Sequence, residues 1–188
     1  MSTYDDRPFS SAPGVLIAVP QLDDPHFERA VVAMLLHNQE GALGLIINLE
    51  TDFLCREVID HLGFAWHGEH EARLLRGGPV DPHGLWVLHP DSLAMDDAIP
   101  AGEHIVASRA PEAIEALCER AIQPLIMGIG CAGWGPGQLE EELAQGTWIN
   151  GPIDPQMLFE WPRKEVWERA LRAMGINPHM IATGGGMH

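Results

Sequence analysis

Short runs of apolar residues, separated by Gly, Pro and Asp, recur along the chain and predict β-strands. Residues 31–36 (VVAMLL) and 42–49 are two of the three most uniform runs, the third being residues 125–129, and the short connection HNQEG joins the first two. A connection of this length that contains Gly is typical of a hairpin, so we expect these two strands to be antiparallel. Their lack of alternating polar residues indicates that both faces are covered. We expect further strands at residues 15–19, 73–76, 85–89, 104–107, 125–129 and 147–150.

Apolar residues at helical spacing predict four helices, over residues 54–62, 111–122, 137–145 and 166–174. About eight strands and four helices in mixed order indicate one compact α/β domain, with α+β as the alternative. Its sheet is expected to be mixed and mostly antiparallel, with the helices packed around it. We expect residues 1–12 to form a disordered leader, 13–181 the domain and 182–188 a flexible tail.

Composition narrows the range of partners. The chain has 188 residues, of which 46% are hydrophobic and 20% charged, which is typical of a folded domain rather than a disordered chain. The 27 acidic residues outnumber the 11 basic ones, and the net charge is −16. A field this negative opposes nucleic acids and anionic membranes. We therefore expect no direct nucleic-acid or membrane partner, whereas a protein or a small molecule remains open.

The cysteines and the chain start indicate the compartment. Cys55, Cys118 and Cys131 are far apart and form no CxxC pair, so neither a disulfide framework nor a zinc ribbon is indicated. The first residues are polar and acidic, unlike a signal peptide, and the apolar runs are too short to span a membrane. We expect a cytoplasmic protein.

One histidine-rich segment is the candidate for a metal site. His61, His67 and His70 lie close in sequence to Glu69 and Glu71, but the HExxH pattern is absent and no third ligand is indicated. A solvated loop is the expected structure, with no metal and no cofactor.

The strongest local motif is GCAGWGPGQLEEEL, residues 130–143, which follows a predicted strand and precedes a predicted helix. Its glycines would let the backbone of a loop from Gly130 to Gln138 approach a ligand closely. No Lys-Ser/Thr pair follows, so the motif is not a P-loop. A tight structural turn under a packed Trp134 is the alternative. Cys131 is either a nucleophile or a buried, inert thiol.

Three other polar or Gly-rich positions have two interpretations each. His37 and Asn38 lie at the tip of the predicted hairpin, and Asn48 lies at its end. A loop histidine could be a general base, whereas Asn and His could equally stabilise the turn. Gly77 and Gly78 could admit a ligand or form a turn after a strand.

Taken together, PGVLIAVPQLDDPHFERAVV, HNQEGALGLIIN, GGPV, GCAGWGPGQLEEEL and the late pattern LFEWP…W…AL..MG resemble the bacterial AlgH/YqgE family from about Pro13 to about Pro178. The resemblance implies a compact α/β domain with a mixed sheet in a bacterial cytoplasm. It also implies an uncharacterised function, often labelled transcriptional regulation, with no established activity or cofactor. The chain departs from the family pattern at Glu50, where Pro is common, and at Cys131, where Tyr is common. The second departure weakens the thiol-nucleophile hypothesis.

Our candidate ligand-binding residues are residues of this chain that match the residue type of the family pattern. Trp148 also matches that pattern but is not a candidate. The candidates are His37, Asn38, Asn48, Gly77, Gly78, His89, Ser108, Arg109, Trp134 and Gln138. We assign no catalytic residue.

The absence of a catalytic motif favours a non-enzymatic regulatory or interaction protein that acts through a protein or small-ligand partner. The alternative is an enzyme or small-molecule-binding protein with a pocket around the Gly130–Gln138 loop and His37/Asn38. Strands 31–36 and 125–129 are expected to be central and to end at the same edge of the sheet. We therefore predict that the loop from Gly130 to Gln138 and the hairpin tip at His37 and Asn38 lie side by side and bound one shared groove.

Overall fold

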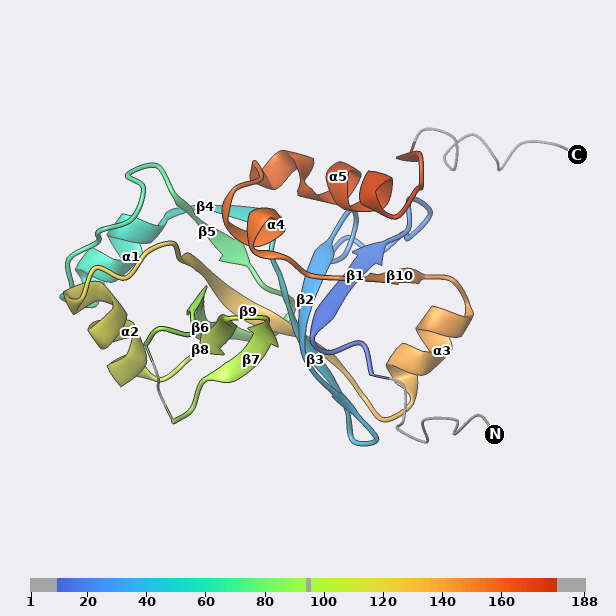
Figure 1. Cartoon of the computed structure of the whole chain (residues 1–188), viewed down its shortest axis with the longest axis horizontal. Helices are drawn as coiled ribbons and strands as arrows, with labels where there is room; N and C mark the ends of the chain where they lie inside the picture. The colour runs from blue at the N-terminus through green and yellow to red at the C-terminus, as the bar shows by residue number, and fades with distance from the viewer. Residues whose placement is uncertain (1–9, 94–95, 179–188) are drawn as a thin grey trace, which may run out of the picture.

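The computed structural model describes residues 10–93 and 96–178; residues 1–9 of the predicted leader and the whole predicted tail lie outside them. The described part forms one α+β domain with a ten-stranded sheet and five α-helices (Figure 1). The strands are β1 Gly14–Ala18, β2 Val31–Asn38, β3 Gly41–Ile46, β4 Glu50–Leu54, β5 Arg73–Arg76, β6 Val80–Pro90, β7 Ile99–Gly102, β8 Ile105–Ser108, β9 Ile126–Trp134 and β10 Trp148–Gly151. The helices are α1 Cys55–His61, α2 Pro111–Glu119, α3 Gln138–Ala144, α4 Pro155–Phe159 and α5 Val166–Ala173, with a 3₁₀ turn at Arg163–Glu165.

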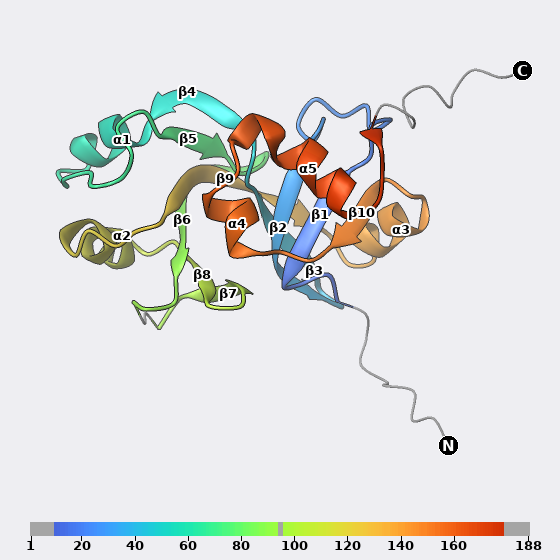
Figure 2. The ribbon, with the colours of Figure 1, turned by 45° about the horizontal axis from the view of Figure 1, so that its top comes forward.

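The sheet is mixed and mostly antiparallel, as predicted. Its strand order is β10-β1-β2-β3-β9-β6-β8-β7, and β4 pairs with β5 beside this path. The paired strands run antiparallel except β5 and β9, which run parallel. β9 joins the strands β10-β1-β2-β3 to the strands β6-β8-β7, because its first part pairs with β6 and its last part with β3 (Figure 2). β7 returns to lie near β2, so the sheet curls.

Helices cover both faces of the curled sheet. α4 and α5 pack on one face, where Trp167 and Leu171 meet core residues such as Val15 and Trp86. The opposite face carries α3 at one end and α1 with α2 at the other. Successive residues of β6 alternate between these layers, as strand geometry requires. None of the described helices is long and apolar enough to cross a membrane.

The predicted loop from Gly130 to Gln138 is the main correction. Residues 130–134 continue strand β9, and only residues 135–137 form a turn before α3. Contacts with neighbouring segments hold the strand together through its glycines. Gly130 adopts a positive φ of 76°, which glycine tolerates, and its carbonyl accepts a hydrogen bond of 2.7 Å from the Trp86 indole. Gly133 pairs with β3.

Three short elements were not predicted. β4 (ETDFL) and β7 (IPAG) lack the apolar runs by which the other strands are recognised. Tertiary pairing creates them, since β4 adds to β5 and β7 adds to β8. α4 begins at Pro155 and is capped by Asp154, whose carboxylate accepts a hydrogen bond from the Met157 amide.

Candidate functional site

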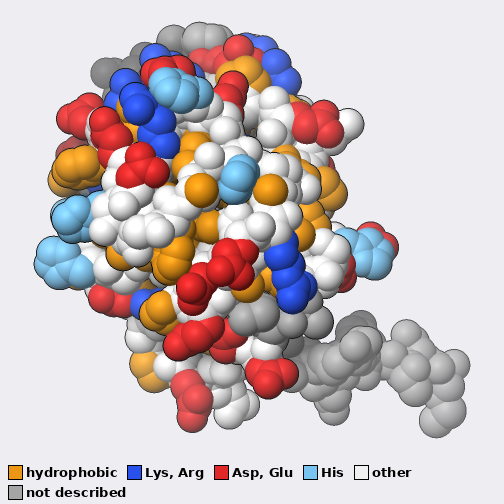
Figure 3. All heavy atoms as spheres, turned by 90° about the vertical axis from the view of Figure 1, so that its left-hand side faces the viewer, with side chains coloured by type: hydrophobic (Ala, Val, Ile, Leu, Met, Phe, Trp, Pro, Cys, Tyr) orange, Lys and Arg blue, Asp and Glu red, His pale blue; other side chains and the backbone are white. Residues whose placement is uncertain are grey.

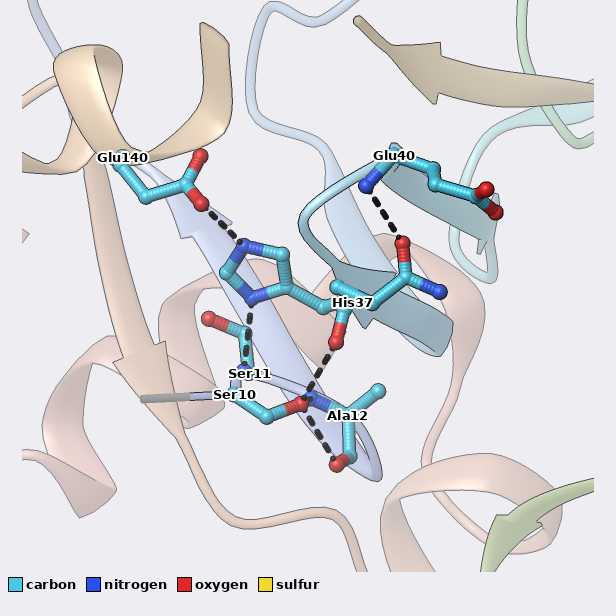
Figure 4. A network of polar contacts seen from close by, with 7 residues as sticks. Ser10, Ser11, Ala12, His37, Glu40 and Glu140 are labelled. Carbon is cyan, nitrogen blue, oxygen red and sulfur yellow. Dashed lines mark hydrogen bonds and ion pairs between the residues drawn. The ribbon is translucent and has the colours of Figure 1, made fainter. Parts of the chain in front are cut away.

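His37, at the end of β2, connects three segments of the chain (Figure 4). Its Nδ1 accepts a hydrogen bond of 3.0 Å from the Ser11 amide, and its Nε2 lies 3.3 Å from the Glu140 carboxylate of α3. The Ser10 hydroxyl donates to the His37 carbonyl. The side chain is 1% exposed. The geometry places the proton of the neutral ring on Nε2, and both ring nitrogens face groups of this chain. Residues 10–12, the end of the predicted leader, are thus held against β2.

Trp134 belongs to a second internal network at α3. Its indole N–H and that of Trp148 both donate to Oε2 of Glu142, at 3.0 and 2.7 Å. The Trp134 and Trp148 rings also pack edge-to-face with centroids 5.9 Å apart, and Phe27 contacts both. Because both indoles are buried, this carboxylate satisfies donors that would otherwise lose their hydrogen bonds.

The hairpin tip and the Trp134 region lie at the same edge of the sheet, as predicted, but one strand separates them. Ala42 of β3 lies between them, paired with His37 on one side and Trp134 on the other. β2 and β9 run in the same direction because each is antiparallel to β3. The predicted groove is not among the cavities described below, since none of these is lined by His37 or Trp134.

Three further candidates hold turns together. Gln138 accepts from the Gly135 amide and donates to Glu142. Asn38 accepts from the Glu40 amide within the hairpin turn. Buried Asn48 accepts from the Val31 amide at 2.7 Å and donates to the Arg29 carbonyl. These contacts support a structural role, and their ligand-binding role stays a prediction.

Gly77 and Gly78 lie where the chain passes closest to β9. A Cβ on Gly77 would lie 2.2 Å from the Gly130 carbonyl oxygen, and one on Gly78 would lie 2.3 Å from the Cys131 carbonyl carbon. No side chain fits at these distances. The two glycines therefore allow two backbone segments to approach each other, and protein atoms occupy the space that a ligand would need.

The side chains of His89 on β6 and Ser108 on β8 are hydrogen-bonded across the two strands, although their register partners are Val106 and Val87. The His89 Nδ1 lies 2.8 Å from the Pro90 carbonyl, so it carries the proton, and Nε2 accepts from the Ser108 hydroxyl at 2.9 Å. This resembles the pairing of a nucleophile with a base. Both residues are 0% exposed, however, and a substrate has no access. Burial lowers the pKa of His89, which keeps the imidazole neutral.

The three thiols are free and buried. Burial raises the pKa of Cys55 to about 12 and also raises the pKa values of Cys118 and Cys131. At Cys131 the nearby Arg109 guanidinium opposes this effect only in part. A thiol with a raised pKa carries little thiolate at neutral pH, which is the opposite of an activated nucleophile.

A polar cavity of about 310 Å³ lies between β4–β5, residues 123–127, the end of α4 and the 3₁₀ turn. Arg163, which the sequence analysis missed, lines it and donates to the carbonyls of Ile47 and Leu158. Burial lowers the pKa of Arg163, and Glu50 partly offsets this. Within residues 10–93 and 96–178, no group of three His, Cys, Asp or Glu side chains could hold a metal ion.

A larger cleft, of about 730 Å³, opens between the end of α1 and the start of α2. Its walls are mostly apolar and comprise Leu62, Phe64, Leu85, Ala110, Pro111 and Ile114. Figure 3 shows this end of the molecule, where hydrophobic side chains are exposed near the middle of the face and acidic side chains gather below them. Leu62 is 48% exposed, and it lies beside other apolar residues of the cleft wall rather than alone on the surface.

Polar groups lie at one side of this cleft. Of the ligand-binding candidates predicted from the sequence, Arg109 lines the cleft. His83 and Asp97 also line it, and no sequence pattern indicated them. Arg109 forms an ion pair with Asp81, and Asp97 accepts a hydrogen bond from the Ala110 amide at the start of α2. An apolar cavity with a few polar groups is the usual form of a binding site. In the sequence, the two large apolar residues Leu62 and Phe64 just after the end of α1 were the signal from which this cleft could have been predicted.

Comparison with known proteins gives a consistent result. Residues 15–179 match a family model described as AlgH-like (DUF179). A UPF0301 protein from Anaeromyxobacter sp. strain K is 35% identical over 190 residues, covering 96% of each chain. A UPF0301 protein from Xanthomonas campestris is 32% identical over 166 residues, covering 87% of this chain and 88% of the relative.

Two solved structures share the fold. The solution structure of the AlgH protein from Pseudomonas aeruginosa superposes with a TM-score of 0.75 at 29% identity, covering 99% of this chain and 100% of that one. A crystal structure of a Corynebacterium diphtheriae protein gives a TM-score of 0.74 at 21% identity, covering 95% and 94%.

Proposed function

Because the chain belongs to the AlgH-like family, whose UPF0301 relatives are named for no activity, we propose that it is a non-enzymatic interaction protein whose partner docks in the cleft between α1 and α2. The observation that carries this proposal is the cleft itself. It leaves Leu62 and Pro111 exposed and Phe64 partly exposed, and covering these apolar groups on binding would be favourable.

The reactive groups support a binding role over catalysis. The His89–Ser108 pair is sealed from solvent, and the buried thiols have raised pKa values. His37 and Trp134 are bonded to groups of this chain. An enzyme built around His37, Asn38 and the Gly130–Gln138 segment therefore has less support than partner binding. Direct DNA binding has little support, because of the net charge of −16.

Quantitative affinity capture from the native lysate tests the proposal. Wild-type protein, Leu62→Glu and Phe53→Glu are immobilised at equal density; Phe53 is 63% exposed and does not line the cleft, so it is the matched control. We expect a partner that wild type and Phe53→Glu retain equally and that Leu62→Glu retains at least tenfold less. Equal capture by all three proteins, or turnover of a lysate metabolite by the wild type, would contradict the proposal.

A further inference from the structure

The rim of the α1–α2 cleft carries more acidic than basic groups. Asp97 lines the cleft directly, and exposed Glu112 and Glu115 stand on α2 beside the lining residues Pro111 and Ile114. The one arginine of the lining, Arg109, is already neutralised by its ion pair with Asp81. The carboxylates of Asp97, Glu112 and Glu115 thus make this rim negative, although Asp97 also accepts a hydrogen bond from the Ala110 amide, and the charge of the whole chain strengthens their field.

The floor of the cleft has a different chemistry from its rim. Leu62 and Phe64 follow the end of α1, Ile114 belongs to α2, and the volume of about 730 Å³ accepts a large side chain. An occupant must therefore combine an apolar group that enters between the helices with positive charges that reach Asp97 and the first turns of α2. Phosphate-bearing partners do not meet the second requirement.

Resting on the proposed function, we propose that the occupant is a segment of another protein in which a large apolar side chain is flanked by Lys or Arg. The apolar side chain packs against Leu62, Phe64 and Ile114. The basic side chains lie against Asp97, Glu112 and Glu115. A polypeptide suits the cleft because these carboxylates are spread over α2 and residues 96–97, and a chain segment presents charges at such a spacing. Burial supplies most of the affinity, and charge supplies selectivity and a fast, salt-dependent association.

Selection from a random phage-displayed library of dodecapeptides tests this chemistry. The library is selected on wild-type protein and counter-selected on Leu62→Glu, and the enriched peptides are synthesised with a fluorophore. We expect enrichment of peptides with Lys or Arg next to a large apolar residue. By anisotropy, Leu62→Glu should weaken their binding at least tenfold, and raising the salt from low to high concentration should weaken it severalfold.

The acidic rim is tested with a charge-matched pair of double variants. Glu112→Gln/Glu115→Gln removes two rim charges, whereas Glu119→Gln/Glu141→Gln removes two exposed charges elsewhere, at the far end of α2 and on α3. We expect about fivefold weaker binding in the first and less than a twofold change in the second. Circular dichroism and urea unfolding confirm that each variant is folded.

Each failure has a separate meaning. Peptides that need Leu62 but lack basic residues, or that bind both double variants equally, would overturn the charge inference and leave the proposed function intact. Failure to enrich any peptide that Leu62→Glu weakens would overturn the peptide-segment inference. The proposed function itself is decided separately by the lysate capture.

Discussion

The two ends of the same sheet face, one under α3 and the other under α1 and α2, use similar residues in different ways. At the α3 end, His37, Trp134 and Trp148 meet the carboxylates of Glu140 and Glu142. At the α1–α2 end, Leu62 is half exposed, and the acidic side chains of α2 face solvent. Residue types that often form binding sites thus stabilise the fold at the α3 end, where they bond to groups of the same chain. At the α1–α2 end such side chains face solvent, and we expect recognition of another molecule there.

The largest expected effect is at the α3 end. Trp134→Ala removes a buried indole from the contact with Phe27 and Trp148, so we expect a loss of about 3–5 kcal/mol in the free energy of unfolding. Urea unfolding followed by circular dichroism measures it. A loss below about 1 kcal/mol would show that Trp134 is not a structural residue and would restore it as a binding group.

The next largest effect is expected at Glu142, and it is compared with a neighbouring glutamate of α3. Glu142→Ala leaves two buried indole N–H groups without their acceptor, and we expect a loss of about 1.5–3 kcal/mol. Glu141→Ala, one residue earlier on the exposed side of α3, is the control and should change stability by less than about 0.5 kcal/mol. Equal stabilities of the two variants would contradict the network.

A third prediction concerns pH. Because burial lowers the pKa of His89 from its ordinary value of 6.5, the unfolded state binds a proton that the folded state resists. The contribution of His89 is therefore present above about pH 6.5 and is lost as the pH falls below it, by at most about 1.4 kcal/mol per pH unit. Unfolding free energies between pH 7 and 5 should fall more steeply in the wild type than in His89→Gln. His67→Gln, which removes an exposed imidazole, is the control; a wild-type slope in His89→Gln would refute the assignment.

The smallest effect is expected at the cleft. Leu62→Ser removes a half-exposed side chain at the end of α1, and stability should change by no more than about 0.5 kcal/mol. Thermal unfolding measured beside Phe53→Ser checks this. A loss above about 1 kcal/mol would mean that Leu62 serves the core, and the contrast between the two ends would weaken.

Most elements could be predicted because their signals are local. The hairpin of β2 and β3 and the stripes of α2 and α5 follow from apolar spacing and from Gly and Pro at their ends. The length of β9 could not be predicted, since Gly130 and Gly133 have low strand propensity and are held there by β3 and β6. β4 and β7 likewise depend on pairing.

The candidate site could be predicted only in part. The expectation that strands 31–36 and 125–129 are central and end at one edge places His37 and Trp134 close together, and the structure has them on either side of Ala42 of β3. Arg109 was named as a candidate, but the cleft beside it was not foreseen. Leu62 and Ile114 both lie on apolar stripes that predict burial, and Ile114 is buried whereas Leu62 is not.

By itself, the sequence determined most of the elements, the acidic character and the family resemblance, because periodicity and composition act between near neighbours or over the whole chain. Only the tertiary structure decided which polar groups are already bonded and which apolar groups remain open. His37 lies against Glu140, and Leu62 lines a cleft that opens toward α2. In both cases the contacts involve segments that are far apart in the sequence. Hydrogen bonding and burial depend on those contacts, and therefore so does the difference between a structural residue and a binding residue.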